Sequence, residues 1–397
     1  MQPKPPFYKV EPEELVGPYD RGPYDRGPYD GEPGPEADLW FLPEPLPQTD
    51  LPPLPYADHR PLLHAPDLAR HWVRTWAAAE AALVRDLAEV ALLFGVLDER
   101  LRSGPLAGGW RHRLALTAAA EISWAAGDRV AQERLALWTA LRLTGPQQDA
   151  QALARAGWAL RRLEGGSALQ IDSVAGLLAF FDRQHLAAEA GDTGLADLIG
   201  LAQSLTDLHP VTQAAALFQG WQMWGGDTVQ RETVQRETAQ GETAQADVVR
   251  YIEAAVLAAR LGARMGAGLG AGLGAGLGAG FLPLGLTGSA TDGSVQDRLA
   301  LWLGRVEQAI RAALRHLDQI AQWQARAQAA MAGAQGRTPD LLIGVLAAWP
   351  QVTAAMAEEL TGAARATVQR NLARLQAAGL IREVTGQGRY RVWSARL

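Results

Sequence analysis

The sequence contains no cysteine, and lysine occurs only at Lys4 and Lys9. The missing thiols exclude disulfides, thiolate metal sites and cysteine nucleophiles. Arginine supplies nearly every other positive charge, which we interpret as the codon bias of a GC-rich genome. Runs typical of β-strands are also scarce, whereas alanine is abundant and 48% of the 397 residues are hydrophobic. This composition predicts an all-α body with a sizeable core.

The charge is distributed unevenly along the chain. The formal net charge is −6. Residues 337–397 hold eight Arg against one Asp and three Glu, a local charge of +4, so the remaining residues together carry −10. This asymmetry is typical of a small DNA-facing module attached to an acidic partner domain.

Residues 1–66 are rich in proline and acidic residues. The opening residues MQPKPPFYKVEPEE place no apolar stretch behind their charges, so we expect no signal peptide, a bacterial cytoplasmic location and no membrane partner. Tandem GPYDR repeats from Gly17 predict a disordered tail, with a tyrosine-bearing docking motif as the alternative. Within residues 38–43, Trp40, Phe41 and Leu42 are costly to expose, so this piece is predicted to anchor on the helical body.

A helical period begins at Asp67 and defines a predicted helical bundle domain over residues 67–226. One apolar stripe, which includes Val84, runs to about residue 103. Further helices are expected at about 110–125, 132–143, 148–163, 172–187, 192–206 and 210–223. Six tryptophans recur at helical spacing and are predicted to lie in the core, namely Trp110, Trp124, Trp138, Trp158, Trp221 and Trp224.

Residues 227–294 are predicted to be low-complexity repeats and a Gly-rich linker around a helix at 246–261. The glycines between residues 266 and 280 all have even numbers, so the dinucleotide fingerprint G-x-G-x-x-G cannot be matched. We therefore interpret the tract at 265–286 as a flexible linker, with membrane contact as the alternative. A long helix follows over 295–333, and its continuous apolar stripe favours either a connector or a dimerisation helix.

Residues 337–397 have the element order of a winged helix-turn-helix. Pro339 begins a helix that ends near Trp349, and Thr353 can cap a second helix. Thr361-Gly362 forms the turn before a third helix over 364–377. A hairpin is expected next, with strands over 380–384 and 389–393 around a tip at 385–388. The predicted fold class is thus an all-α helical domain followed by a small C-terminal winged helix-turn-helix with a β-hairpin wing.

The third helix carries the predicted DNA-binding residues. Because a helix fits the major groove, Arg365, Thr367, Gln369 and Arg370 are expected to reach base edges. Arg374 lies further along and is expected to meet phosphate, while Gln387 and Arg389 would reach DNA from the wing. Winged helices also dock proteins, so an adaptor is the alternative.

The stretch from Ala347 to Trp393 resembles the winged helix-turn-helix that closes many Fic-family proteins and some bacterial regulators. The wider chain is similar to an alphaproteobacterial family of helix-turn-helix DNA-binding proteins. The matching pieces are DLWFLP (38–43), GWRHRLAL (109–116), GDRV (127–130) and RLALW (134–138). The resemblance extends over most of the folded chain and implies a DNA-binding transcriptional regulator with a helical N-terminal domain.

A Fic enzyme requires a His-Pro-Phe motif that continues into Asn-Gly-Arg, whereas this chain reads His209-Pro-Val-Thr-Gln213. His209 is therefore predicted to be a structural helix-start residue. The seven histidines show no H-x-x-x-H spacing, and Ser167, Ser173 and Ser204 lack a G-x-S-x-G setting. We expect no enzyme activity, no cofactor and no metal. The expected partner is double-stranded DNA, with a homodimer as a further candidate. The rival interpretations are an adaptor and a degenerate Fic-like protein that lacks the catalytic motif.

Overall fold

The computed structural model describes ten stretches of the chain. The described residues all belong to one unit of the chain, residues 61–397. The described stretches are 66–103, 107–141, 147–165, 169, 171–183, 194–224, 241–265, 279–286, 293–386 and 391–397. The predicted anchor at 38–43 and the GPYDR repeats lie outside them.

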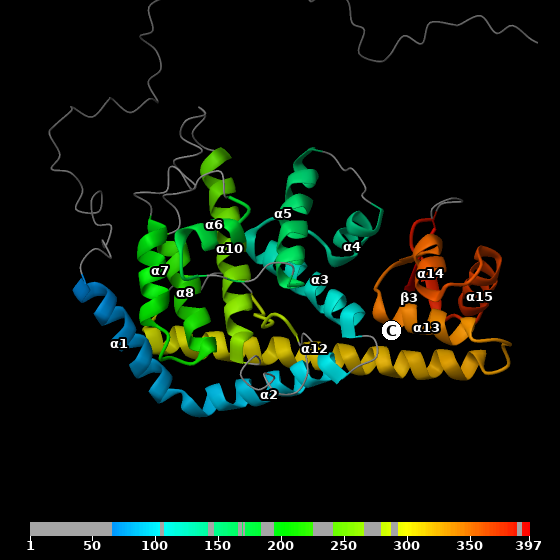
Figure 1. Ribbon diagram of the computed structural model, residues 1–397, viewed down its shortest axis with the longest axis horizontal. Helices are drawn as coiled ribbons and strands as arrows, with labels where there is room; N and C mark the ends of the chain where they lie inside the picture. Colours follow the sequence, from blue (N-terminus) through cyan, green and yellow to red (C-terminus); the bar gives the residue numbers. More distant parts are fainter. Residues whose placement is uncertain are drawn as a thin grey trace, which may run out of the picture. The chain divides into compact units, whose positions relative to one another are not determined.

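The described unit is mostly helical (Figure 1). Its helical body contains α1 (Pro66–Ala82), α2 (Val84–Ser103), α3 (Ala107–Ala126), α4 (Gln132–Leu141), α5 (Gln147–Leu163), α6 (Val174–Phe180), α7 (Gly194–Ser204), α8 (Pro210–Trp224), α10 (Gly241–Gly262) and α12 (Val295–Met331). The C-terminal elements are α13 (Thr338–Ala348), β1 (Val352–Thr353), α14 (Ala354–Thr361), α15 (Arg365–Ala377), β2 (Ile381–Glu383) and β3 (Val392–Ala395). The predicted fold class is confirmed.

The long helix α12 connects the body to the C-terminal elements. It begins with a capping box, in which the Asp297 amide donates to Ser294 Oγ at 3.2 Å and the Ser294 amide donates to Asp297 Oδ2 at 3.0 Å. Its first half packs against α1, α2 and α8, and its second half packs against α13 (Figure 1). Near its end, Trp323 is fully buried and its Nε1 donates to the Leu380 carbonyl at 2.8 Å. The apolar stripe is thus covered within one chain, which favours the connector over the dimerisation helix.

Two predictions for the body are wrong. The stripe from Asp67 is not one helix, because the chain bends at Leu83 between α1 and α2. The bend lets α1 contact α7 and α8 while α2 follows α12, and it leaves Val84 64% exposed. Trp124, predicted to lie in the core, is 54% exposed near the end of α3. Both errors arise because helical spacing identifies a candidate face but not the neighbours that cover it.

The end of the glycine tract is part of the core rather than a flexible linker. Phe281 and Leu282 are 1% and 0% exposed, and Leu284 is also buried. The Leu282 amide donates to the Ala259 carbonyl of α10 at 2.8 Å. Gly262 allows this approach, because a Cβ atom there would lie 2.5 Å from Leu282 Cδ2. The linker prediction therefore fails for residues 279–286, and residues 266–278 lie outside the described stretches.

A three-stranded antiparallel sheet of order β1-β3-β2 completes the C-terminal module. Ile381 pairs with Ala395, and Val352 pairs with Trp393. The second wing strand ends at Ala395 and not at the predicted residue 393, because β3 pairs on both sides and buries Ala395 as well as Val392. Residues 389 and 390 of the predicted strand lie outside the described stretches. The two-residue strand β1 was not predicted. No described helix is long and apolar enough to cross a membrane.

We predict that Leu282→Ala lowers the free energy of unfolding by about 2–5 kcal/mol, because it removes a fully buried side chain. Leu301→Ala is the matched control, since Leu301 is 41% exposed on α12, and it should cost less than about 1 kcal/mol. Urea unfolding of both variants measures the difference. Equal losses would contradict burial of residues 279–286.

Candidate nucleic-acid interface

The turn between α14 and α15 is built from local sequence signals. Thr353 caps α14, since its Oγ1 accepts from the Met356 amide at 3.1 Å. Gly362 ends the helix in the left-handed conformation with φ of 65°, which favours glycine. The predicted cap and the predicted glycine turn are both confirmed. Together they fix the angle at which α15 leaves α14.

Helix α15 has one buried face and one exposed face. Val368, Leu372 and Leu375 are at most 1% exposed. The opposite face carries the exposed side chains of Arg365, Gln369, Arg370 and Arg374. Thr367 differs from the prediction because it is half-buried.

Two polar contacts involve side chains of α15. Asn371 is buried and its Nδ2 donates to the Thr367 carbonyl at 3.0 Å, inside α15. Arg365 lies near Glu358 of α14, with 3.8 Å between Arg365 Nε and Glu358 Oε1. The Arg365 side chain is 73% exposed, so this ion pair in water leaves the guanidinium accessible.

The base of the wing is held by Glu383 at the end of β2. Its carboxylate accepts from the Thr385 amide at 2.8 Å and from the Gly386 amide at 2.9 Å. The Thr385 hydroxyl also donates to it, and these bonds lower the pKa of Glu383. Gln387 and Arg389, predicted to reach DNA from the wing tip, lie outside the described residues.

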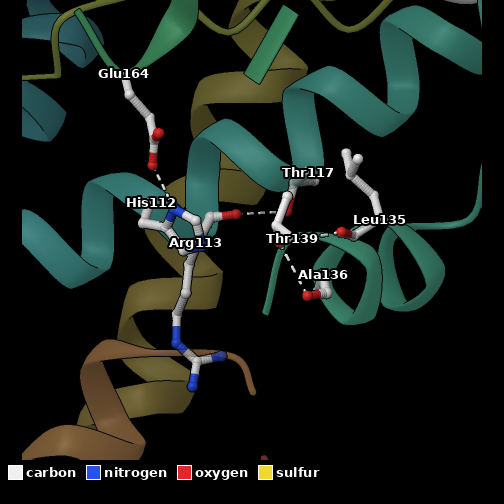
Figure 2. Close-up of polar contacts among 7 residues, drawn as sticks. All are labelled: His112, Arg113, Thr117, Leu135, Ala136, Thr139 and Glu164. Carbon is white, nitrogen blue, oxygen red and sulfur yellow. Dashed lines mark hydrogen bonds and ion pairs between the residues drawn. The ribbon is translucent and has the colours of Figure 1, made fainter. Parts of the chain in front are cut away.

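Arg113 of α3 ties the body to the first helix of the C-terminal module. Its side chain is 4% exposed. Nε donates to the Ala347 carbonyl at 2.9 Å, and Nη2 donates to the carbonyls of Leu346 and Trp349 at 2.7 Å each. Figure 2 shows the side chain leaving α3, while the neighbouring His112 meets Glu164. The guanidinium therefore satisfies carbonyls that the C-terminus of α13 would otherwise leave unpaired.

We call the three hydrogen bonds from Arg113 to the carbonyls of Leu346, Ala347 and Trp349 the Arg113 clamp. Close packing surrounds it. A Cβ atom at Gly109 would lie 2.3 Å from Ala348 Cβ, so only glycine fits there. The His112 and Trp349 rings lie 4.7 Å apart between centroids. Gln351 Nε2 donates to the Glu133 carbonyl at the start of α4, at 3.1 Å. Helices α3 and α4 thus contact the segment between α13 and β1 at several points.

The charge on Arg113 is balanced by dipoles, since no described carboxylate pairs with it. Burial lowers its pKa to about 9, and the guanidinium remains protonated at pH 7. Carbonyl oxygens at a helix C-terminus carry partial negative charge and favour this protonated form. The contact therefore holds only while α13 keeps its C-terminal turn in place.

The clamp was not found from the sequence, although one signal was present. Arg113 lies on the same helical face as Leu116 and Ala120, which are both buried. An arginine on a buried stripe needs a partner, and the sequence alone does not say which carbonyls provide it. The GWRHRLAL piece contains both Gly109 and Arg113.

The predicted structural role of His209 is confirmed. Its Nδ1 accepts from the Val211 amide at 3.3 Å at the start of α8, and its own amide donates to Glu80 Oε2 at 3.0 Å. Burial lowers the pKa of His209, which agrees with an accepting, unprotonated Nδ1. The described stretches also contain no group of three or more His, Cys, Asp or Glu that could hold a metal ion.

No protein-family model matches the chain, and no curated protein matches it. Among solved structures, it is similar to the crystal structure of a Fic family protein from Desulfovibrio desulfuricans G20. The sequences are 12% identical, the match covers 79% of this chain and 95% of that chain, and the TM-score is 0.34. At this TM-score the likeness assigns no function to the chain.

We predict opposite effects for two glycine-to-alanine substitutions within helices. Gly304→Ala in α12 should stabilise the protein by about 0.5–1 kcal/mol, because a Cβ there meets nothing within 4 Å. Gly109→Ala should destabilise it by about 1–3 kcal/mol, because the new methyl group collides with Ala348. Chemical unfolding measures both. A stabilising Gly109→Ala would show that α3 does not press against α13.

Proposed function

We propose that this protein is a non-enzymatic, cytoplasmic regulator that binds double-stranded DNA through α15. The proposal rests on one observation, which is that α15 has one buried face and one exposed, basic face. One face is fixed in the core by Val368 and its buried neighbours, and the other presents arginine and glutamine to solvent. A rigid helix with such a face fits the major groove.

The exposed side chains have the chemistry that base and phosphate recognition require. Arg370 can donate two hydrogen bonds to guanine O6 and N7, and Gln369 can pair with adenine N6 and N7. Arg365 at the start of the helix is the second candidate for base contact. Arg374 lies at the last turn, where a contact to phosphate would set the register of the helix without reading sequence.

The charge distribution supports the same proposal. Residues 337–397 carry +4, from eight Arg against four acidic residues, within a chain of net charge −6. The positive module would attract the phosphate backbone, while the acidic remainder would limit non-specific attachment of the body to DNA. A two-fold symmetric operator read by a homodimer is a further part of the proposal.

A protein-docking adaptor is the alternative function. Leu341 of α13 and Leu360 of α14 are 42% and 47% exposed and favour it, because exposed leucines on the module are available to an apolar partner. Binding to such a partner would depend weakly on salt, whereas DNA binding would fall steeply as salt rises.

The test of the function is capture of genomic duplex fragments on the purified full-length protein at several salt concentrations. We expect enrichment of one sequence, with an affinity that decreases steeply with salt. If no fragment is enriched over bulk DNA at any salt concentration, duplex binding by this protein is refuted and the adaptor becomes the leading function.

On the enriched sequence, Arg370→Ala and Arg365→Ala should each weaken binding by about 1–3 kcal/mol and relax the preference at one base position. Arg374→Ala should weaken binding to all sequences and reduce the salt slope by about 1. Arg85→Ala is the control, since Arg85 is exposed on α2 and distant in sequence from the module. Fluorescence anisotropy measures all four variants. Unchanged affinity in the α15 variants would remove that helix from the interface.

A further inference from the structure

A cleft of about 490 Å³ lies beside the Arg113 clamp. Its walls come from α3, α4 and α12 on one side and from β2, β3 and the segment before β1 on the other. The volume is within the range of small-molecule binding sites, roughly 300–1,000 Å³. A ligand in it would touch the helical body and the winged helix at once.

One wall carries two arginines on the same face of the sheet. Arg382 pairs across the strands with Ser394, and Arg396 follows Ser394 by two residues, so the three side chains share a face. All three line the cleft. Both arginines are exposed, and no ion pair or hydrogen bond of their guanidinium groups exists within the described residues.

Two residues that line the cleft carry buried polar atoms without partners among the described residues. His316 Nε2 and Gln351 Oε1 are buried and have no hydrogen-bond partner among the described residues. Buried polar atoms without partners are rare, and they commonly mark a place for water or a ligand. Burial is the main cause that lowers the pKa of His316, and the nearby positive charge of Arg113 lowers it further.

The balance of charge on the walls favours an anion. The positive groups are Arg113, Arg382 and Arg396. The acidic side chain among these lining residues is that of Glu133, which is exposed. Of the arginines that line the cleft, Arg382 and Arg396 have no side-chain partner within the described part of the chain, and their forked geometry suits carboxylate or phosphate groups.

We propose that this cleft binds a small organic anion, whose carboxylate or phosphate group contacts Arg382 and Arg396 and whose hydroxyl or amide group reaches Gln351 and His316. Because the ligand bridges α12 and the wing sheet, its binding adds contacts between the winged helix and the body. No residue of α15 lines the cleft, so the proposed anion site does not depend on whether α15 binds DNA.

The test is calorimetric titration of the full-length protein, without DNA, with citrate, inorganic phosphate and adenosine monophosphate at constant ionic strength. We expect saturable binding of citrate or adenosine monophosphate, and the one that binds distinguishes a carboxylate ligand from a phosphate ligand. The double variant Arg382→Gln/Arg396→Gln should raise the dissociation constant at least tenfold. The control Arg85→Gln/Arg161→Gln, which removes the same charge from exposed positions on α2 and α5, should change it less than twofold.

Two results would overturn the proposal. The first is the absence of saturable binding by both organic anions, whether or not phosphate binds. The second is an equal loss of affinity in the cleft variant and in the control, which would show that the anion responds to overall charge. Circular dichroism of both double variants establishes that they are folded before the titrations are compared.

Discussion

The placement of the C-terminal module depends on one buried guanidinium. Arg113 donates to three carbonyls at the end of α13, and Gly109 lets the two helices approach closely enough for these bonds to form. Leaving a charge in the interior without such acceptors would cost several kcal/mol. The clamp therefore ties the position of α13, and with it α14 and α15, to the helical body.

Helix α12 contributes the second connection. Its buried stripe continues from the body to Trp323, which donates to the Leu380 carbonyl just before β2. A winged helix fixed by a clamp on α13 and by a continuous helix that packs against α13 has little freedom to reorient. If the module reads DNA, the body would then set the direction from which α15 approaches the groove. A ligand in the neighbouring cleft would act on the same contacts.

The sequence predicts the features that depend on short-range signals. Thr353 caps the start of α14 and Gly362 forms the left-handed turn at its end. Both roles depend only on residues close by in the sequence, so the sequence is enough to predict them. The stripe of α12 and the inward face of α15 follow from helical spacing alone. The exposed arginines of α15 are the part of the candidate site that could be predicted.

The features that depend on tertiary partners were missed. A glycine tract predicts a linker, yet Leu282 near its end is buried because α10 offers a place for it beside Gly262. Trp124 satisfies the helical spacing and is nevertheless half exposed, because no described residue covers it at that part of α3. The carbonyls that accept hydrogen bonds from Arg113 lie more than 230 residues further along the sequence. Neither composition nor periodicity can predict a contact between residues so far apart in the sequence.

The central claim is that the winged helix and the helical body move together, and the missing cysteines allow a direct measurement. Leu92→Cys on α2 and Ala377→Cys at the end of α15 introduce two thiols at exposed positions of a chain that has none. Spin labels at these sites report a distribution of distances by pulsed electron paramagnetic resonance. A labelled pair at Gln308→Cys and Gln322→Cys, both exposed within α12, gives the width expected of one rigid element. If the winged helix is fixed on the body, we expect a single distribution about as narrow as that control, whereas a broad or multiple distribution would show that the two parts move independently.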